Sequence, residues 1–459
     1  MISQAKALIA DIEQKFPGSV ALIVGGAVRD IIMGNEPHDI DIATNADIND
    51  IAKRYDAVDI GASKEFGIVS VGFQGERFEV AAFRTESGTS DNRHPDEVQF
   101  VDNFEDDAAR RDFTINAMGY GSEGVIDPHG GIQDITNRII RAVGNPDDRF
   151  EEDALRILRA ARFAARFGYY IEPDTKAAMI RKAHLVKHLS VERITGEVLK
   201  TAAISGTALA QFIETLNEVN LLDDVFPLVN TMRDYEHTPE THPEGGVFDH
   251  TLSALRKSRS SDPIVNIALV YHDIGKTRTR TYNDHGHVCY KGHEAISVKL
   301  FKQIAKEKKF SNAQIEAAVF AIENHMIAHR LHTMKKSKVV AIRQSPFYRI
   351  LIDVCYADDA SREGLFDEDD FAEREARVEA LYKIIGERAA FEERMKPLIN
   401  GRMIMNLATD EGVSISGPDI GKIKNAVREV VIEKDFDITL QDTSRMVREM
   451  VKEIMKENP

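Results

Sequence analysis

The stretch LIVGGAVRDIIMGNEPHDIDIATNA, residues 22–46, combines strand, turn and helix patterns in a short span. The apolar run at 21–24 predicts a buried strand, and two glycines then break it where the backbone turns tightly or a ligand approaches closely. Apolar residues at helical spacing predict a short helix over 27–33. Residues 38–43 alternate with period two, which predicts a second strand carrying Asp39 and Asp41 on one face.

The pair Asp39 and Asp41 is the first candidate site. Two carboxylates about 7 Å apart on a strand repel each other unless a cation lies between them. Mg²⁺ is the natural cation, because it prefers carboxylate and phosphate oxygens. An edge strand with two solvated aspartates is the alternative. Glycines 25 and 26 followed by a helix start and Arg29 favour a metal-and-triphosphate site instead.

Composition limits the class of protein. A chain of 459 residues with 43% hydrophobic and 29% charged residues is typical of a globular protein with two to four domains. No apolar run approaches the roughly 20 residues that span a bilayer, so no membrane association is expected. Two cysteines, Cys289 and Cys355, favour a reducing cytoplasm. A net charge of −16 argues against indiscriminate nucleic-acid binding, although a local basic surface can still bind RNA.

The pattern along the chain predicts four parts. Residues 1–135 mix strands and helices and form an α/β head, with strands expected over 19–25, 39–43, 68–73 and 77–83. The polar segment 86–107 is expected to be a loop over a cleft. Helical periods then predict a neck over 136–235, a histidine-rich domain over 236–365 and a tail over 366–459.

Two further segments of the head carry polar groups. Glu79 alternates with Phe78 and Val80, so it is either a third carboxylate beside the aspartate pair or an ordinary surface residue. The segment RRDFTINAMGY, 110–120, places four polar side chains at an expected helix start, where the aspartate caps the helix and the arginines contact phosphate or ribose. These side chains are Arg110, Arg111, Asp112 and Asn116.

The neck begins with EEDALRILRAARFAARFGY, 151–169, which predicts one continuous helix. Its arginines share about a third of the circumference: Arg156, Arg159, Arg162 and Arg166. A solvated basic face with pairs such as Asp153–Arg156 is one interpretation. In the other, the Asp153 carboxylate accepts from an exocyclic amine and the Arg156 guanidinium donates to the base. Such a pair would accept C and A and reject G and U.

The third part contains histidines and aspartates in an H…HD…H…H…D pattern. The candidate ligands are His250, His272, Asp273, His293, His325 and Asp358. Imidazole and carboxylate suit a divalent transition metal such as Ni²⁺, Co²⁺, Mn²⁺ or Fe²⁺. The pattern resembles an HD-domain phosphohydrolase, and because all six positions are filled we favour a metal-competent site over a relic. Asp359 and His329 remain alternative ligands.

The chain contains seven motifs in this order: GGAVRD, DIDIA, RRDFTINAM, DPHGGIQDI, EEDALRILRAARFAARFG, SVERITGE and, in the tail, INGRMIMNLATDEGVSISGPDIGKI. In these motifs the chain resembles the class II tRNA nucleotidyltransferase and bacterial poly(A) polymerase family, especially its CCA-adding enzymes. The resemblance implies a nucleotidyltransferase head with a polymerase β-like mixed sheet and helices, followed by all-α neck, HD and tail domains.

The resemblance also implies roles for particular residues. Asp39 and Asp41 would hold catalytic Mg²⁺, joined by Glu79 as the third catalytic candidate. The nucleotide would be bound by residues of the glycine turn, the RRD segment and the neck helix. They are Gly25, Gly26, Arg29, Arg110, Arg111, Asp112, Asn116, Asp153, Arg156, Arg159 and Arg162. Within this set, Asp153 and Arg156 would read CTP and ATP.

The expected function is addition or repair of the 3′-terminal CCA of tRNA, with tRNA, CTP and ATP as partners and a phosphohydrolase activity in the HD domain. A protein partner is not expected. The alternatives are a poly(A) polymerase, a specialist that adds only CC or only A, and an HD phosphohydrolase whose head merely docks RNA.

Overall fold

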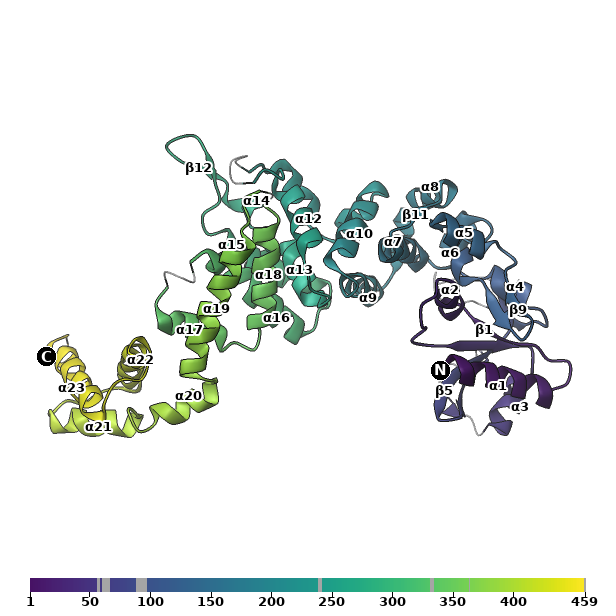
Figure 1. The fold of residues 1–459 in the computed structure, drawn as a ribbon. Helices are drawn as coiled ribbons and strands as arrows, with labels where there is room; N and C mark the ends of the chain where they lie inside the picture. The colour runs from purple at the N-terminus through teal and green to yellow at the C-terminus, as the bar shows by residue number, and fades with distance from the viewer. Residues whose placement is uncertain are drawn as a thin grey trace. The chain divides into compact units, whose positions relative to one another are not determined.

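The computed structural model describes residues 1–55, 58–59, 67–87, 97–237, 242–330, 334–362 and 364–457 (Figure 1). The chain forms two compact units. The first contains residues 1–231, 261–266 and 303–310, and the second contains 232–260, 267–302 and 311–459. The division into four domains stays a prediction.

The head is built on a seven-stranded sheet in the order β3-β4-β5-β2-β1-β8-β9. Strands β2 and β5 run parallel and the other neighbours run antiparallel, so the predicted mixed sheet is confirmed. The strands are β1 Ala21–Val24, β2 Asp41–Thr44, β3 Val58–Asp59, β4 Ile68–Phe73, β5 Glu76–Ala82, β8 Gly119–Gly121 and β9 Gly124–Ile126.

Helices α1 (Ile2–Lys15) and α3 (Ile48–Arg54) lie together against this sheet (Figure 1). Helix α1 buries Leu8 and Ile12 at helical spacing, and the Tyr55 hydroxyl after α3 donates to Asp11 Oδ2 at 2.7 Å. All four residues of β1 are buried. This central strand therefore gives the glycine turn that follows it a rigid base.

The opening stretch folds largely as predicted. Strand β1 ends at Val24, Gly25 adopts φ +71, and α2 (Gly26–Ile32) begins at once. The second strand starts only at Asp41, which pairs with Val24, and Asp39 lies in the bend before it. The prediction that Asp39 belongs to this strand is wrong, because the chain before Asp41 has no strand partner once β1 has turned away at Gly25.

The segment expected as a loop over 86–107 is partly regular. Strand β6 (Arg84–Ser87) pairs antiparallel with β7 (Glu97–Phe100), and α4 (Phe104–Ala109) is capped by Asn103, whose side chain accepts from Asp106 N. The loop prediction is wrong for these residues, and residues 88–96 lie outside the described part of the chain.

The rest of the first unit is mainly helical. Its helices are α5 Gly131–Asn137, α6 Pro146–Glu152, α7 Leu155–Phe167, α8 Pro173–Lys182, α9 Val191–Ala202, α10 Gly206–Glu218 and α11 Leu222–Val225. The single helix predicted over 151–169 is wrong, because α6 ends at Glu152 and α7 begins at Leu155. Asp153 Oδ1 accepts from Leu155 N at 3.0 Å, and this side-chain bond competes with helix continuation.

The helices that lie wholly or partly in the second unit are α12 Val247–Lys257, α13 Pro263–Tyr271, α14 Lys276–Thr279, α15 His293–Glu307, α16 Asn312–Asn324, α17 Lys336–Arg343 and α18 Tyr348–Ala360. The short 3₁₀ helix η5 spans His325–Arg330. The tail contains α19 Glu368–Ile385, α20 Arg388–Met395, α21 Gly401–Asp410, α22 Gly417–Glu433 and α23 Leu440–Glu457. In the described residues, no helix has the length and apolar character that a membrane crossing needs.

Candidate functional site

A cavity of about 570 Å³ lies in the first unit between the β1–α2 turn, the segment 110–116 and helix α7. Every predicted nucleotide-binding residue lines it, together with Asp41. The lining is Gly25, Gly26, Arg29, Asp41, Arg110, Arg111, Asp112, Asn116, Asp153, Arg156, Arg159, Arg162, Phe163, Arg166 and Lys200. Residues far apart in the sequence thus line one cavity, and many of them are arginines.

Asp41 and Glu79 are direct neighbours in the sheet, because β2 and β5 place them in register. Both side chains reach solvent, whereas Phe78 and Val80 are buried. The surrounding protein displaces water from Asp41 and raises its pKa. The charges of Glu79 and Asp39 add to this rise, and Arg111 opposes it. Clustered carboxylates that repel one another fit a hard divalent cation.

The glycine turn packs directly on two arginines. A Cβ at Gly25 would lie 3.3 Å from Arg111 Nη1, and one at Gly26 would lie 3.3 Å from Arg29 Nη2. The positive φ of Gly25 also disfavours any side chain there. The turn therefore brings bare backbone and two guanidinium groups to the same wall of the cavity.

A hydrogen-bonded network joins the head to α7. Arg29 Nη1 donates to Asn116 Oδ1 at 2.6 Å, and Asn116 Nδ2 donates to Asp112 Oδ1 at 3.2 Å. Arg159 donates to Asp112 Oδ2 from Nε and Nη2 at 2.9 and 2.7 Å. Burial alone would raise the pKa of Asp112, but the Arg159 guanidinium outweighs it and lowers that pKa.

Asp112 does not cap a helix, so that prediction is wrong. The helix expected at this point is only the 3₁₀ turn η2 (Thr114–Asn116), whose N-cap residue is Phe113. The Asp112 side chain accepts from Phe113 N at 2.8 Å instead. The chain enters strand β8 at Gly119, which leaves no room for a longer helix.

The sequence interpretation missed Asp107, which lies fully buried behind the two adjacent arginines. Arg110 Nη2 donates to its Oδ1 at 2.7 Å, and Arg111 Nη2 donates to its Oδ2 at 2.8 Å. Asp107 lies on α4 and the two arginines follow the end of that helix, three and four residues later, a spacing that could have revealed the pairing.

The arginine face of α7 is present, since Arg156, Arg159, Arg162 and Arg166 all line the cavity. Arg156 Nη1 donates to Glu152 Oε2 at 2.7 Å and its Nη2 to the carbonyl of Arg110 at 2.9 Å. Arg162 forms a buried ion pair with Glu197 at 2.5 Å. Arg156, Arg159 and Arg162 are thus each held in place by an acidic side chain.

Asp153 and Arg156 both reach the cavity, but no ion pair joins them in the described residues. Arg193 Nη2 on α9 donates to Asp153 Oδ2 at 2.8 Å and to Oδ1 at 3.0 Å. Arg193 was missed because it stands 40 residues from Asp153. Its place in the SVERITGE motif is the only sequence signal that pointed to it.

In the second unit, the predicted metal ligands are brought together and buried. They come from α12, the turn just after α13, the starts of α15 and η5, and α18: His250, His272, Asp273, His293, His325 and Asp358. Asp359 is not part of this cluster but pairs with Arg362. The side chain of His329 lies outside the described residues.

The two oxygens of Asp273 face two different groups of histidines. Oδ2 lies 3.4 Å from His272 Nε2 and 3.6 Å from His250 Nε2. Oδ1 lies 3.1 Å from His293 Nε2 and 3.7 Å from His325 Nε2. In each group the ligand atoms lie within 4.8 Å of one another, as a shared metal ion requires.

Asp358 belongs to the first of these groups. Its Oδ1 lies 2.9 Å from His250 Nε2 and 3.6 Å from His272 Nε2. Asp358 and Asp273 therefore place carboxylate oxygens beside the same two imidazoles.

Three of the histidines are held by backbone carbonyls. The Nδ1 atoms of His272, His293 and His325 lie 2.8, 2.9 and 2.8 Å from the carbonyl oxygens of Leu269, Tyr290 and Ile322. Such acceptors place the proton on Nδ1 and leave the Nε2 lone pair for a metal. Among the described atoms, His272 Nε2 is buried without a hydrogen-bond partner, which fits a ligand atom.

The charges in this cluster also call for a cation. Burial would raise the pKa of Asp273, but the charges of Lys276 and His272 hold it well below its usual value. Burial lowers the pKa of His272, yet Asp273 and Asp358 outweigh it and raise that pKa to about 10. Burial and the His272 charge lower the pKa of His325 to about 4. Two buried carboxylates thus attract a positive charge, which a divalent ion can supply.

Three family models match the chain. Residues 21–141 match the poly A polymerase head domain, 168–232 match the probable RNA and SrmB- binding site of polymerase A, and 247–363 match the HD domain. A CCA-adding enzyme of Bacillus subtilis is 44% identical over 210 residues, 45% of this chain and 52% of that protein. One of Enterococcus faecalis is 48% identical over 204 residues, 43% of this chain and 49% of that protein. The chain spans about half the length of the curated relatives it matches.

Solved structures resemble the chain over nearly its whole length. The Bacillus stearothermophilus CCA-adding enzyme in complex with CTP matches with a TM-score of 0.73 and 24% identity, covering 99% of both chains. A tRNA nucleotidyltransferase complexed with a primer tRNA and an incoming ATP analog matches with a TM-score of 0.56 and 20% identity, covering 82% of this chain and 99% of that chain. At these identities the structures show the fold. Taken with the three domain matches and the curated relatives, they show that the chain carries a poly A polymerase head domain and an HD domain and is similar in fold to CCA-adding enzymes.

Proposed function

We propose that this protein transfers nucleotides from CTP and ATP to the 3′ end of tRNA and so builds or repairs the terminal CCA. The observation that carries the proposal is the single cavity in which Asp41, the Gly25–Gly26 turn and the arginine face of α7 meet. The curated relatives named CCA-adding enzymes support the same activity.

In this proposal the carboxylates of Asp39, Asp41 and Glu79 hold Mg²⁺. Bound Mg²⁺ supplies charge stabilisation at the α-phosphate and at the leaving pyrophosphate. Arg29 and Arg111 lie against the glycine turn, where they place positive charge beside a triphosphate. Phosphoryl transfer depends mainly on positioning and electrostatics, and this wall provides both.

The other lining residues hold the nucleotide. Asp112 and Asn116 form the network that positions ribose contacts, with Arg110 beside them. Arg159 and Arg162 place charge near the phosphates, and their acidic partners Asp112 and Glu197 keep the guanidinium groups in fixed orientations.

Base selection is assigned to Asp153 and Arg156. A carboxylate accepts the amino group that cytosine and adenine share, and a guanidinium donates to the neighbouring ring nitrogen. Guanine and uracil present a carbonyl and an N–H in the reverse order, so they would leave buried polar groups unpaired. Arg193 fixes the Asp153 carboxylate through two contacts and completes this template.

The test uses purified protein, tRNA lacking CCA, and each labelled nucleotide alone and in combination. The proposal expects two C residues with CTP alone and one further A when ATP is added. Long A tails on unrelated RNA would favour a poly(A) polymerase, and addition of only CC or only A would favour a specialist. If no nucleotide is added at all, the remaining alternative is an HD phosphohydrolase whose head merely docks RNA. The reducing cytoplasm is the proposed location, supported by two cysteines that form no disulfide, Cys289 and Cys355.

We also propose a phosphohydrolase activity for the HD domain, carried by the convergence of four imidazole Nε2 atoms on two buried carboxylates. The donor set suits Ni²⁺, Co²⁺, Mn²⁺ or Fe²⁺, and the four histidines with Asp273 and Asp358 would hold such an ion. Bound ions supply Lewis acidity toward a phosphate oxygen and activate water. The assay is hydrolysis of p-nitrophenyl phosphate and bis-p-nitrophenyl phosphate after loading with each metal. An absence of hydrolysis with all four would refute it.

A further inference from the structure

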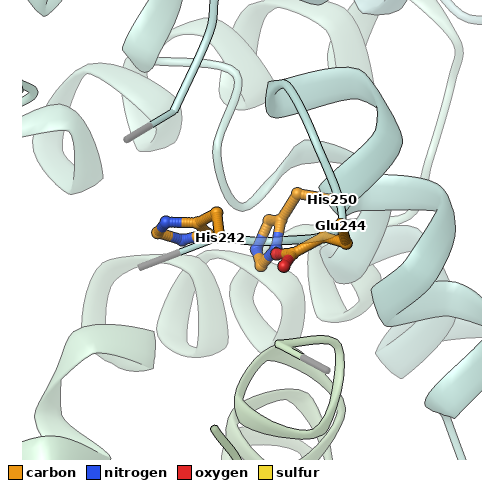
Figure 2. Close-up of side chains that lie close together, drawn as sticks. All are labelled: His242, Glu244 and His250. Atoms are coloured by element: carbon orange, nitrogen blue, oxygen red, sulfur yellow. The ribbon is translucent and has the colours of Figure 1, made fainter. Parts of the chain in front are cut away.

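The turn just before α12, residues 242–246, brings a carboxylate to the back of a metal-ligand histidine. Glu244 Oε1 lies 2.6 Å from His250 Nδ1, and the two side chains are 5% and 1% exposed. Figure 2 shows the Glu244 carboxylate against the His250 ring, with His242 close by. The motifs of the sequence gave Glu244 no role.

Two glycines allow the chain to fold this tightly. Gly245 adopts φ +121, and a Cβ there would lie 3.0 Å from Asp249 Oδ2. A Cβ at Gly246 would lie 2.9 Å from the carbonyl of Tyr235, which also accepts from Val247 N at 2.9 Å. Side chains at either position would push the turn away from α12, so the pair of glycines is what lets Glu244 reach His250.

The hydrogen-bond partner of His250 Nδ1 differs in kind from the partners of the other three histidines. They stand just after a helix or at its first residue, where the carbonyl three residues earlier accepts from Nδ1. His250 lies inside α12, and the carbonyl three residues earlier, that of Val247, already accepts from Thr251 Oγ1 at 2.9 Å. The groups within hydrogen-bond distance of His250 Nδ1 are instead two side chains, Glu244 and Ser361.

We propose that Glu244 is a positioning residue of the HD site, an inference that rests on the metal-binding HD site proposed above. Its carboxylate accepts from His250 Nδ1–H and directs Nε2 toward Asp358 and Asp273, at 2.9 and 3.6 Å. Ser361 Oγ, 3.0 Å from the same Nδ1, is a second acceptor and itself donates to the Asp358 carbonyl. A carboxylate partner fixes the tautomer and makes the imidazole a stronger ligand.

A competing interpretation makes His242, Glu244 and His250 an ion site of their own, because their ligand atoms lie within 4.8 Å of one another. The 2.6 Å separation of Glu244 and His250 Nδ1 is a hydrogen-bond distance, which requires a proton on Nδ1. If Nδ1 instead bound an ion, Nε2 would carry the proton and could not serve the HD site. The positioning role uses both nitrogens of His250 without this conflict.

The experiment measures Co²⁺ and Ni²⁺ binding to the full-length chain by competition with a chelator, and bound metal by elemental analysis. We expect Glu244→Ala to weaken binding about 10- to 100-fold with the number of bound ions unchanged. Glu244→Gln should stay closer to wild type, since an amide oxygen still accepts from Nδ1–H. The matched control His242→Ala should bind within about twofold of wild type, because it removes a neighbour that lies outside the positioning contact.

A readout of the ring itself separates positioning from general destabilisation. Nitrogen-15 NMR of metal-free protein should show His250 protonated on Nδ1 in wild type and in Glu244→Gln, and a mixed or changed state in Glu244→Ala. Thermal unfolding identifies any variant that fails to fold. If Glu244→Ala does not fold, the isosteric variant Glu244→Gln is used instead, and the protonation of its His250 Nδ1 tests the inference.

Three results would overturn the inference. Wild-type affinity in folded Glu244→Ala would show that Glu244 does not support His250. Loss of one bound ion in both Glu244→Ala and His242→Ala would assign these residues as ligands. If wild-type protein binds neither metal, the HD metal proposal itself fails.

Discussion

Replacing Arg193 by alanine should damage nucleotide selection although Arg193 does not line the cavity. The change removes both contacts between Arg193 Nη2 and the Asp153 carboxylate, at 2.8 and 3.0 Å. One hydrogen bond to a charged group contributes about 1.5–3 kcal/mol. The side chains are 19% and 22% exposed, so most of that range applies.

At about 1.4 kcal/mol for each factor of ten, kcat/KM for nucleotide addition should fall roughly 10- to 100-fold. CTP and ATP should be affected equally, because one carboxylate is proposed to accept from both bases. The assay is single-turnover addition of C to tRNA lacking CCA and of A to tRNA ending in CC, with GTP and UTP as the rejected nucleotides. Arg193→Lys should fall in between, since an ammonium keeps the charge without the planar fork.

The matched control is Arg181→Ala. It removes an exposed arginine that pairs with Asp147, a residue outside the cavity lining, and should leave addition within about twofold of wild type because exposed pairs contribute little. Thermal unfolding must show that both variants are folded. Unchanged addition by Arg193→Ala would refute the positioning of Asp153, and a loss confined to ATP would refute the shared template.

Four further predictions follow from the sites. Asp41→Asn should lower addition by more than about 1000-fold while tRNA binding in a filter assay persists, because only the ion's charge stabilisation is lost; addition within tenfold of wild type would refute the metal assignment. His272→Ala should abolish metal-stimulated phosphate hydrolysis yet leave CCA addition near normal, since the two sites share no residue; a folded variant that loses addition would contradict this independence. Gly275→Ala should lower the free energy of unfolding in urea by about 1–3 kcal/mol, because its Cβ would lie 2.1 Å from the His293 carbonyl; an unchanged unfolding midpoint would contradict it. Dialysis against a chelator should stop addition, and Mg²⁺ should restore it; activity that survives metal removal would exclude a metal-dependent transfer.

The sequence predicted those parts of the fold that depend on neighbouring residues. Strand β4 follows the predicted bounds at 68–73, and the strand–glycine–helix order of the opening stretch is correct. Buried runs and alternation determine these elements locally. The start of β2 at Asp41 was not predictable in this way, because it depends on where β1 stops pairing.

In the candidate sites, too, the sequence revealed what short local patterns encode and missed what depends on distant residues. Motif residues such as Asp41 and His272 are recognisable from short patterns, and they do lie in the cavity and in the metal cluster. Their supporting partners lie far away in the sequence or in a turn without a pattern, as Arg193 and Glu244 do. A single sequence specifies which groups carry the chemistry more readily than which groups hold them still.

The burial of the proposed metal ligands, which come from five separate segments, has a mechanical consequence. An ion bound by residues between His250 and Asp358 would tie α12, the turn just after α13, α15, η5 and α18 at one point. It would restrict the unfolded chain as a covalent cross-link does, by closing several loops at once. Cys289 and Cys355 form no disulfide, so in this unit a bound ion would take the place of a covalent cross-link. Resistance to proteolysis would then report the metal supply of the cell.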